Sequence, residues 1–241
     1  MAKLKPTTHI VVLHGWTLDP TVADKWRPFI ELMKAEGLTI HFWPLPGLAK
    51  APKKPLTLKN YVDWLAKKTK HLEKFGLLGH SFGGQLAIRF TKLHPEKVTK
   101  LILVDNSGII DNSLGKVIKR LVFKTVAKIG RKIAPSPQLR RLLYRFSRET
   151  DYYQAAPTQR ETMSNILMDE IRPDLAQIKT PTLVIWGRND RITPLEFGRL
   201  VADTIPQASL KIIAGARHSA IYTHPQQVVK LVTAFIVKTL S

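Results

Sequence analysis

The pentapeptide Gly79-His80-Ser81-Phe82-Gly83 constrains the fold of this chain most, because a short apolar run precedes it and an amphipathic stretch follows it. A G-x-S-x-G sequence in that context is typical of a sharp turn from a strand into a helix, which lifts the serine Oγ clear of the sheet. The glycines leave room for close backbone approach. A helix beginning at Phe82 would point its free N–H groups toward the serine and stabilise negative charge there. Ser81 is therefore a candidate nucleophile.

Short apolar runs alternate with amphipathic stretches along most of the chain. Strands are predicted near residues 10, 40, 76, 101, 184 and 211, and helices at 24–36, 60–74, 82–93, 194–204 and 225–239. This alternation predicts an α/β fold with about six mostly parallel strands and helices on both faces of the sheet. In such a sheet the loops that follow the strands share one edge.

Two loops at that edge offer a base and an acid, which a serine needs in order to act as a nucleophile. Asp190 follows the fifth predicted strand and His218 follows the sixth. The order serine, acid, histidine is the one expected with this type of turn. Asp105, directly after the fourth strand, is the competing acid, and Asp190 is preferred. The catalytic residues are thus predicted to be Ser81, His218 as base and Asp190 as the group that orients the base.

The run Thr193-Pro194-Leu195-Glu196 follows Asp190 closely. Its pattern predicts a capping box with proline at the first helical position. Such a box would fix the start of the next helix and so hold the loop that carries the acid.

Acyl transfer also needs donors for the oxyanion. The backbone N–H of Phe82 is one candidate, and that of Trp16, in a loop that Gly15 allows to bend, is the other. His14 in the same loop has no carboxylate or second histidine at ligand spacing, so no metal site is predicted. No cofactor is expected.

Residues 109–170 interrupt the alternation, because they contain no convincing strand and at least two helical patterns. We interpret this segment as a helical cap over the site, although an insertion that only packs beside the sheet is the alternative. The predicted domains are therefore an α/β core at 1–108 and 171–241 and a cap at 109–170. Apolar residues could line a substrate pocket beneath the cap. The candidates are His14, Phe123, Tyr144, Tyr152 and Met163.

The formal net charge of +20 is concentrated in the predicted cap, where residues 111–149 hold eleven Lys or Arg against two acidic residues. A basic amphipathic helix can bind an anionic surface, and the alternative is an ordinary solvated face. We hypothesise that the cap attracts an anionic substrate, an acyl carrier protein or anionic lipid. No recognised nucleic-acid module is present, so a specific nucleic-acid partner is not expected.

The chain contains no cysteine, which excludes disulfides and thiolate catalysis and fits a reducing compartment. The apolar run at 10–13 is too short for a signal peptide. No stretch approaches the roughly 18 to 20 apolar residues that a membrane span needs. A cytoplasmic protein is therefore expected, and its oligomeric state stays open.

Several motifs together resemble the α/β-hydrolase superfamily over essentially the whole chain. The resemblance implies a small, six-stranded member with a cap after the fourth strand, and it supports Trp16 and Phe82 as oxyanion donors. Serine as nucleophile separates the chain from epoxide hydrolases and haloalkane dehalogenases. The motifs are His14-Gly15-Trp16, Pro44-Leu45-Pro46-Gly47, Gly79-His80-Ser81-Phe82-Gly83-Gly84, His94-Pro95-Glu96-Lys97-Val98, Trp186-Gly187-Arg188-Asn189-Asp190 and Gly215-Ala216-Arg217-His218.

Among serine members the chain looks similar to small carboxylesterases, including pimeloyl-acyl-carrier-protein methyl ester esterases, and to carbon–carbon bond hydrolases. The resemblance implies hydrolysis of short to medium carboxylic esters through an acyl-enzyme. Two alternatives remain open at this point: a carbon–carbon bond or lactone hydrolase with the same three residues, and a non-catalytic scaffold that binds an acidic partner.

Overall fold

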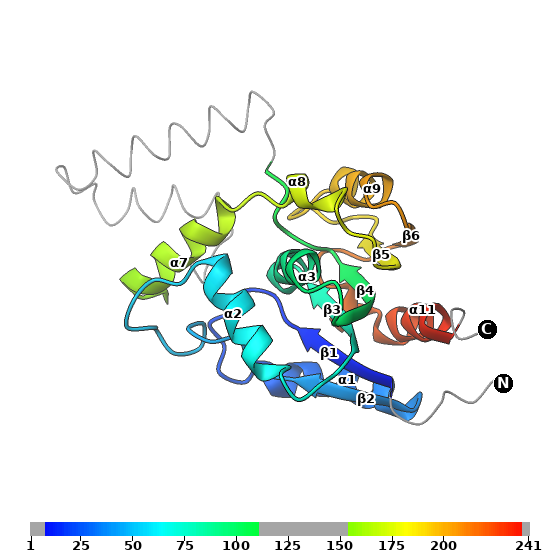
Figure 1. Ribbon diagram of the computed structural model, residues 1–241, viewed down its shortest axis with the longest axis horizontal. Coiled ribbons are helices and arrows are strands. Elements are labelled where there is room, and N and C mark those ends of the chain that lie inside the picture. The colour runs from blue at the N-terminus through cyan, green and yellow to red at the C-terminus, as the bar shows by residue number, and fades with distance from the viewer. Residues whose placement is uncertain (1–7, 111–153, 238–241) are drawn as a thin grey trace.

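A computed structural model describes residues 8–110 and 154–237. The described residues form one parallel six-stranded sheet in the order β2-β1-β3-β4-β5-β6 (Figure 1). The predicted α/β fold with six parallel strands is therefore confirmed. The strands are β1 (Thr8–Leu13), β2 (Leu38–Phe42), β3 (Phe75–His80), β4 (Val98–Val104), β5 (Thr182–Gly187) and β6 (Ala208–Ile213).

Helices cover both faces of this sheet, so the central strands are apolar on both sides. In β1, Val11 and Leu13 belong to the core on the face that α2, α3 and α9 cover, whereas Ile10 and Val12 belong to the core on the face of α1 and α11. This alternation follows from the two-residue period of a strand. The helices are α1 (Val22–Ala35), α2 (Leu58–Lys68), α3 (Phe82–Leu93), α7 (Pro157–Leu167), α8 (Arg172–Leu175), α9 (Leu195–Thr204), α10 (Ala220–Thr223) and α11 (Pro225–Val237).

One predicted helix is shorter than its periodicity indicated. α2 ends at Lys68 and does not continue to residue 74. Thr69 caps the helix, and the Leu72 N–H bonds to the Thr69 carbonyl in a turn. The turn buries Leu72 in the core although Leu72 lies outside the helix. Its apolar side chain therefore continued the helical spacing of the sequence without being part of the helix.

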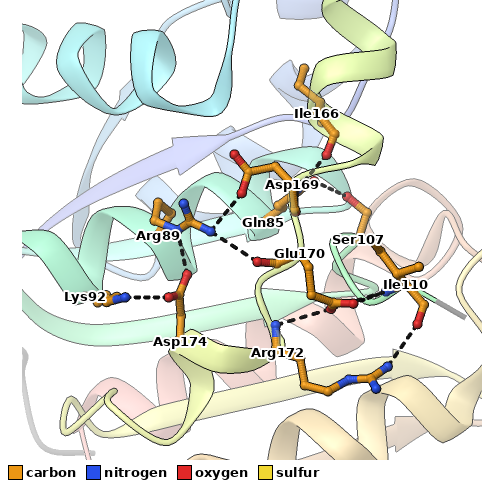
Figure 2. Close-up of polar contacts among 10 residues, drawn as sticks. All are labelled: Gln85, Arg89, Lys92, Ser107, Ile110, Ile166, Asp169, Glu170, Arg172 and Asp174. Atoms are coloured by element: carbon orange, nitrogen blue, oxygen red, sulfur yellow. Dashed lines mark hydrogen bonds and ion pairs between the residues drawn. The ribbon is translucent and has the colours of Figure 1, made fainter. Parts of the chain in front are cut away.

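A row of polar side chains on α3 holds the segment that leads back into the sheet (Figure 2). The Gln85 amide donates to the carbonyls of Ile166 and Asp169 at 2.9 and 2.7 Å. Arg89 forms ion pairs with the carboxylates of Asp169 and Asp174 at 2.8 and 2.5 Å. Lys92 pairs with Asp174 at 2.7 Å. Residues 85, 89 and 92 share one helix face because they are four and three positions apart.

A second set of contacts joins the two ends of the segment that separates β4 from α8. Glu170 accepts the N–H of Ile110 at 3.2 Å, and Arg172 donates to the Ile110 carbonyl at 2.9 Å. The Ile171 N–H also bonds to the Gly108 carbonyl at 3.0 Å. The chain therefore leaves the core and returns to it at one place (Figure 2). Residues 111–153, most of the predicted cap, lie outside the described residues, and the division into core and cap stays a prediction.

We expect Asp174→Ala to lower the free energy of unfolding by about 2 kcal/mol, because it removes the buried carboxylate that two partly buried cations share. The Asp174 side chain is only 4% exposed. Urea denaturation measures the loss. Asp63→Ala is the matched control, since its pair with Lys59 is exposed and should contribute about 0.5 kcal/mol or less. Equal losses in the two variants would contradict this account.

Candidate active site

Ser81 lies in the sharp turn between β3 and α3 and has a positive φ of 52°. Two glycines make this conformation possible by allowing backbone to pack against backbone. A Cβ on Gly79 would lie 2.3 Å from the Gly83 carbonyl oxygen, and one on Gly83 would lie 2.3 Å from the Leu13 carbonyl oxygen. The turn therefore requires glycine at both positions, and it leaves the serine at the start of a helix, where N–H groups lack intrahelical acceptors.

The structure brings Ser81, His218 and Asp190 together from the loops after β3, β6 and β5. The Ser81 Oγ is 2.9 Å from His218 Nε2, and His218 Nδ1 is 2.8 Å from Asp190 Oδ2. A carboxylate only accepts, so Nδ1 carries the proton in that bond and Nε2 is free to accept from the serine hydroxyl. The side chain of Asp190 is completely buried, and that of His218 is 13% exposed. The three groups are within reach for proton transfer.

Asp190 keeps its charge in this buried position because four donors surround it. Burial favours the neutral form, but bonds from His218, the Thr193 hydroxyl and the Ile192 N–H outweigh it and hold the Asp190 pKa below its ordinary value. The Thr193 N–H also donates to Oδ1, at 3.0 Å. A carboxylate with several such donors titrates well below neutrality, so Asp190 is ionised at neutral pH.

The capping box predicted at Thr193–Glu196 is wrong. Helix α9 begins at Leu195 with Pro194 as its N-cap, and no side chain bonds to the cap. The Thr193 hydroxyl turns inward and donates to Asp190 Oδ2 at 2.8 Å. A buried carboxylate needs that donor more than an exposed helix end needs an acceptor, because water can satisfy the helix end. Thr193 is thus a site residue whose role the sequence analysis missed.

Asp105, the competing acid, lies at the end of β4 and is fully buried. No hydrogen bond joins its side chain to His218 among the described contacts. Its Oδ1 instead accepts the Gly187 N–H at 2.8 Å. The structure therefore sets Asp190, and not Asp105, against the imidazole.

His80 is a second residue near the site that the sequence analysis missed. Its Nε2 is 2.8 Å from the His218 carbonyl oxygen, which can only accept, so Nε2 carries a proton and donates. Burial, helped by the nearby His218, lowers the His80 pKa to about 3. His80 therefore stays neutral and holds the backbone of the histidine loop. Its place inside the G-x-S-x-G motif gave no sign of this contact.

The loop after β1 lies directly against Ser81, because a Cβ on Gly15 would be 3.0 Å from the Ser81 Cβ. His14 holds this loop: its Nδ1 donates to the Gly15 carbonyl at 2.7 Å, and its Nε2 accepts the Leu45 N–H at 2.8 Å. Burial lowers the His14 pKa to about 4. The side chains of Trp16 and Phe82, whose N–H groups are the predicted oxyanion donors, pack together with ring centroids 6.4 Å apart.

A cavity of about 560 Å³ opens beside Ser81 and His218 and is lined by Trp16, His80 and Tyr222 among others. Two predicted pocket residues do not line it: His14 is buried with both ring nitrogens bonded to the main chain, and Met163 is half-buried on α7. The other three, Phe123, Tyr144 and Tyr152, lie outside the described residues. Within the described ranges, no cluster of three or more potential metal ligands occurs.

A family model described as alpha/beta hydrolase fold matches residues 8–225. The chain belongs to the alpha/beta hydrolase family. The superfamily predicted from the motifs is therefore confirmed. A similar protein, the pimeloyl-[acyl-carrier protein] methyl ester esterase of Nitrosomonas europaea, is 25% identical over 91% of this chain and 92% of the relative.

Two further matches are consistent with this family. A 2-hydroxy-6-oxononadienedioate/2-hydroxy-6-oxononatrienedioate hydrolase of Comamonas testosteroni is 31% identical over 68% of this chain and 63% of the relative. The crystal structure of an alpha/beta hydrolase enzyme from a sediment metagenome of the Mar Chica lagoon, Morocco, has a TM-score of 0.71 at 24% identity and covers 98% of this chain and 93% of that one. Of the helices in residues 8–110 and 154–237, none is long and apolar enough to cross a membrane.

Because His14 and His80 are held neutral in the fold, acid should destabilise this hydrolase. Their folded pKa values of about 4 and about 3 lie below the ordinary value of 6.5, so the unfolded chain binds more protons between those limits and stability falls as pH falls. His80→Gln retains a donor near the Nε2 position but cannot titrate. In this variant the slope of the free energy of unfolding against pH, between pH 6 and 4, should be smaller by about 1 kcal/mol per pH unit. Urea denaturation across this range tests it, and an unchanged slope would refute the assignment.

Proposed function

We propose that this chain is a serine hydrolase that cleaves carboxylic esters through an acyl-enzyme. The observation that carries the proposal is the pair of contacts at His218, 2.9 Å to the Ser81 Oγ and 2.8 Å to Asp190 Oδ2. A serine bonded to an imidazole that a buried carboxylate orients is the arrangement that serine acyl transfer requires.

In the proposed first half-reaction, the Ser81 Oγ attacks the ester carbonyl while His218 Nε2 takes its proton. Asp190 holds the ring in the tautomer that leaves Nε2 free and stabilises the imidazolium that forms. The N–H groups of Phe82 and Trp16 are the proposed donors to the oxyanion. His218 then returns the proton to the leaving alcohol, and the Ser81 ester remains.

In the second half-reaction, the same imidazole takes a proton from water, whose oxygen attacks the acyl-enzyme carbonyl. The bond to the Ser81 Oγ then breaks, His218 returns the proton to that oxygen, and the acid leaves. No redox change or cofactor enters either step. The cavity of about 560 Å³ beside Ser81 has a volume within the usual range of small-molecule sites, which favours short to medium acyl chains. The similarity to a methyl ester esterase supports a small leaving alcohol.

A carbon–carbon bond hydrolase is the second candidate, because the Comamonas testosteroni relative with 31% identity carries that type of name. A ring-fission dienone assayed beside p-nitrophenyl esters from acetate to palmitate separates the two. We expect ester turnover to peak at short or medium chains and to exceed dienone turnover. The reverse order would favour the second candidate.

Ser81→Ala should lower kcat on p-nitrophenyl esters by at least about a thousandfold, as removal of a triad nucleophile does. A fluorophosphonate should label the wild-type chain at Ser81 and fail to label the variant. Ser219→Ala is the matched control, because Ser219 lines the same cavity and has no part in the proposed chemistry. Retention by Ser81→Ala of more than about a tenth of the rate would contradict the proposal.

The basic segment 111–149 leads us to propose an anionic substrate or carrier as well. Hydrolysis of an acyl-carrier-linked ester should slow steeply as salt rises, because salt screens attraction between exposed charges. Hydrolysis of a neutral short ester should change little. Equal salt dependence for the two substrates would remove this part of the proposal, without affecting the assignment of Ser81.

A further inference from the structure

The turn that follows β4 contacts the main chain of the proposed nucleophile. The Ser81 N–H donates to the Val104 carbonyl at 3.1 Å, and the Ser107 N–H donates to the Ser81 carbonyl at 3.1 Å. Asp105 lies between these two contacts in the sequence. The backbone of Ser81 therefore bonds through its N–H and its carbonyl to residues within two positions of Asp105.

Asp105 itself contacts both ends of the loop that carries Asp190. Its Oδ1 accepts the N–H of Gly187, where β5 ends, at 2.8 Å. Its carbonyl oxygen is 3.3 Å from the hydroxyl of Thr193, which closes the loop before α9. That hydroxyl also lies 2.8 Å from Asp190 Oδ2 and 3.1 Å from His218 Nδ1. One residue thus connects the strand beside the nucleophile with the loop of the acid.

Two features make Asp105 costly for the fold. It is fully buried, and its φ is 47°. Positive φ outside glycine is uncommon and carries strain. Ser81 is the other non-glycine residue with positive φ in the described ranges. An amide at position 105 would still accept the Gly187 N–H, but it would remove the negative charge.

Ionisation of Asp105 falls in the range where such an enzyme works. Burial raises the Asp105 pKa to about 7, and the charge of Asp190 adds to this rise. The N–H groups of Gly187 and Ala220 and the imidazole of His218 oppose it. The charged groups that act on Asp105 are thus Asp190 and His218. A negative charge near an imidazole favours its protonated form, which is the form created when His218 takes the serine proton.

We propose that Asp105 is a positioning residue for the Ser81 reaction: it fixes the loop of Asp190 relative to the nucleophile, and its carboxylate supports the imidazolium of His218. This inference rests on the proposed function, because it assigns Asp105 a part in the same proton transfer. Asp105 touches no reacting atom and acts through Gly187, Thr193 and the local electric field.

Two substitutions separate the two parts of this role. Asp105→Asn keeps an oxygen for the Gly187 N–H and tolerates the positive φ, but it cannot ionise. Asp105→Gly fits the same backbone conformation and removes the acceptor. Asp174→Asn is the matched control, since Asp174 is another buried aspartate, and its partners are Arg89 and Lys92 on α3 (Figure 2).

The experiment measures kcat, KM and kcat/KM on a p-nitrophenyl ester from about pH 5.5 to about pH 9, with the melting temperature of each variant. Asp105→Asn should stay within about threefold of wild-type kcat near pH 6 and fall to about a fifth or less near pH 8.5, with the acid limb of kcat/KM moved to lower pH. Asp105→Gly should lose at least about tenfold in kcat at both pH values, with KM within about twofold. Asp174→Asn should melt at a lower temperature and keep the wild-type pH profile.

A wild-type pH profile in Asp105→Asn would overturn the proposal, and so would wild-type kcat in folded Asp105→Gly. If Asp105→Gly does not fold, the pH profile of Asp105→Asn decides alone. The activity of Ser81→Ala and the fluorophosphonate labelling of the wild-type chain are measured in parallel, as tests of the proposed function. Full activity in Ser81→Ala would mean that the proposed function has failed, whereas inactive Ser81→Ala with unaltered Asp105 variants would mean that only this inference has failed.

Discussion

The buried carboxylate of Asp190 is the constraint on which the rest of this site depends. A charge removed from water must be matched by hydrogen bonds, or the group takes up a proton and loses its function. The Ile192 N–H, both donors of Thr193 and the imidazole of His218 supply them. Each donor comes from a fixed position at the edge of the sheet. The buried charge therefore constrains the conformations of the loops that carry Asp190 and His218, and it fixes the tautomer of the histidine.

Much of this arrangement could be predicted from the sequence, because the relevant signals are periodic or local. The short apolar run of β1 and the glycines around Ser81 predict a buried strand and a sharp turn. Loops after parallel strands meet at one edge, which is why the positions of Asp190 and His218 in the chain were enough to place them together.

The three residues whose roles the sequence did not predict, Thr193, His80 and Leu72, have a feature in common. Thr193 has the local pattern of a helix cap and was assigned to one, yet its hydroxyl bonds to a carboxylate that approaches from its own loop. His80 bonds to a carbonyl 138 positions away, and Leu72 continues a helical pattern in a turn. In each case the position of the residue depends on a particular partner in the folded chain. Local propensity carries no information about which contact is present.

The contacts of Glu170 and Arg172 with Ile110 have a consequence for how this fold can diversify. The segments 108–110 and 170–172 are hydrogen-bonded to each other. The entropic cost of closing a connection between them therefore grows only slowly with the number of residues in that connection. Sequences of different size and character could therefore be exchanged between these points while the sheet and the reacting groups keep their places. Substrate range could then evolve, or be engineered, by grafting at this junction.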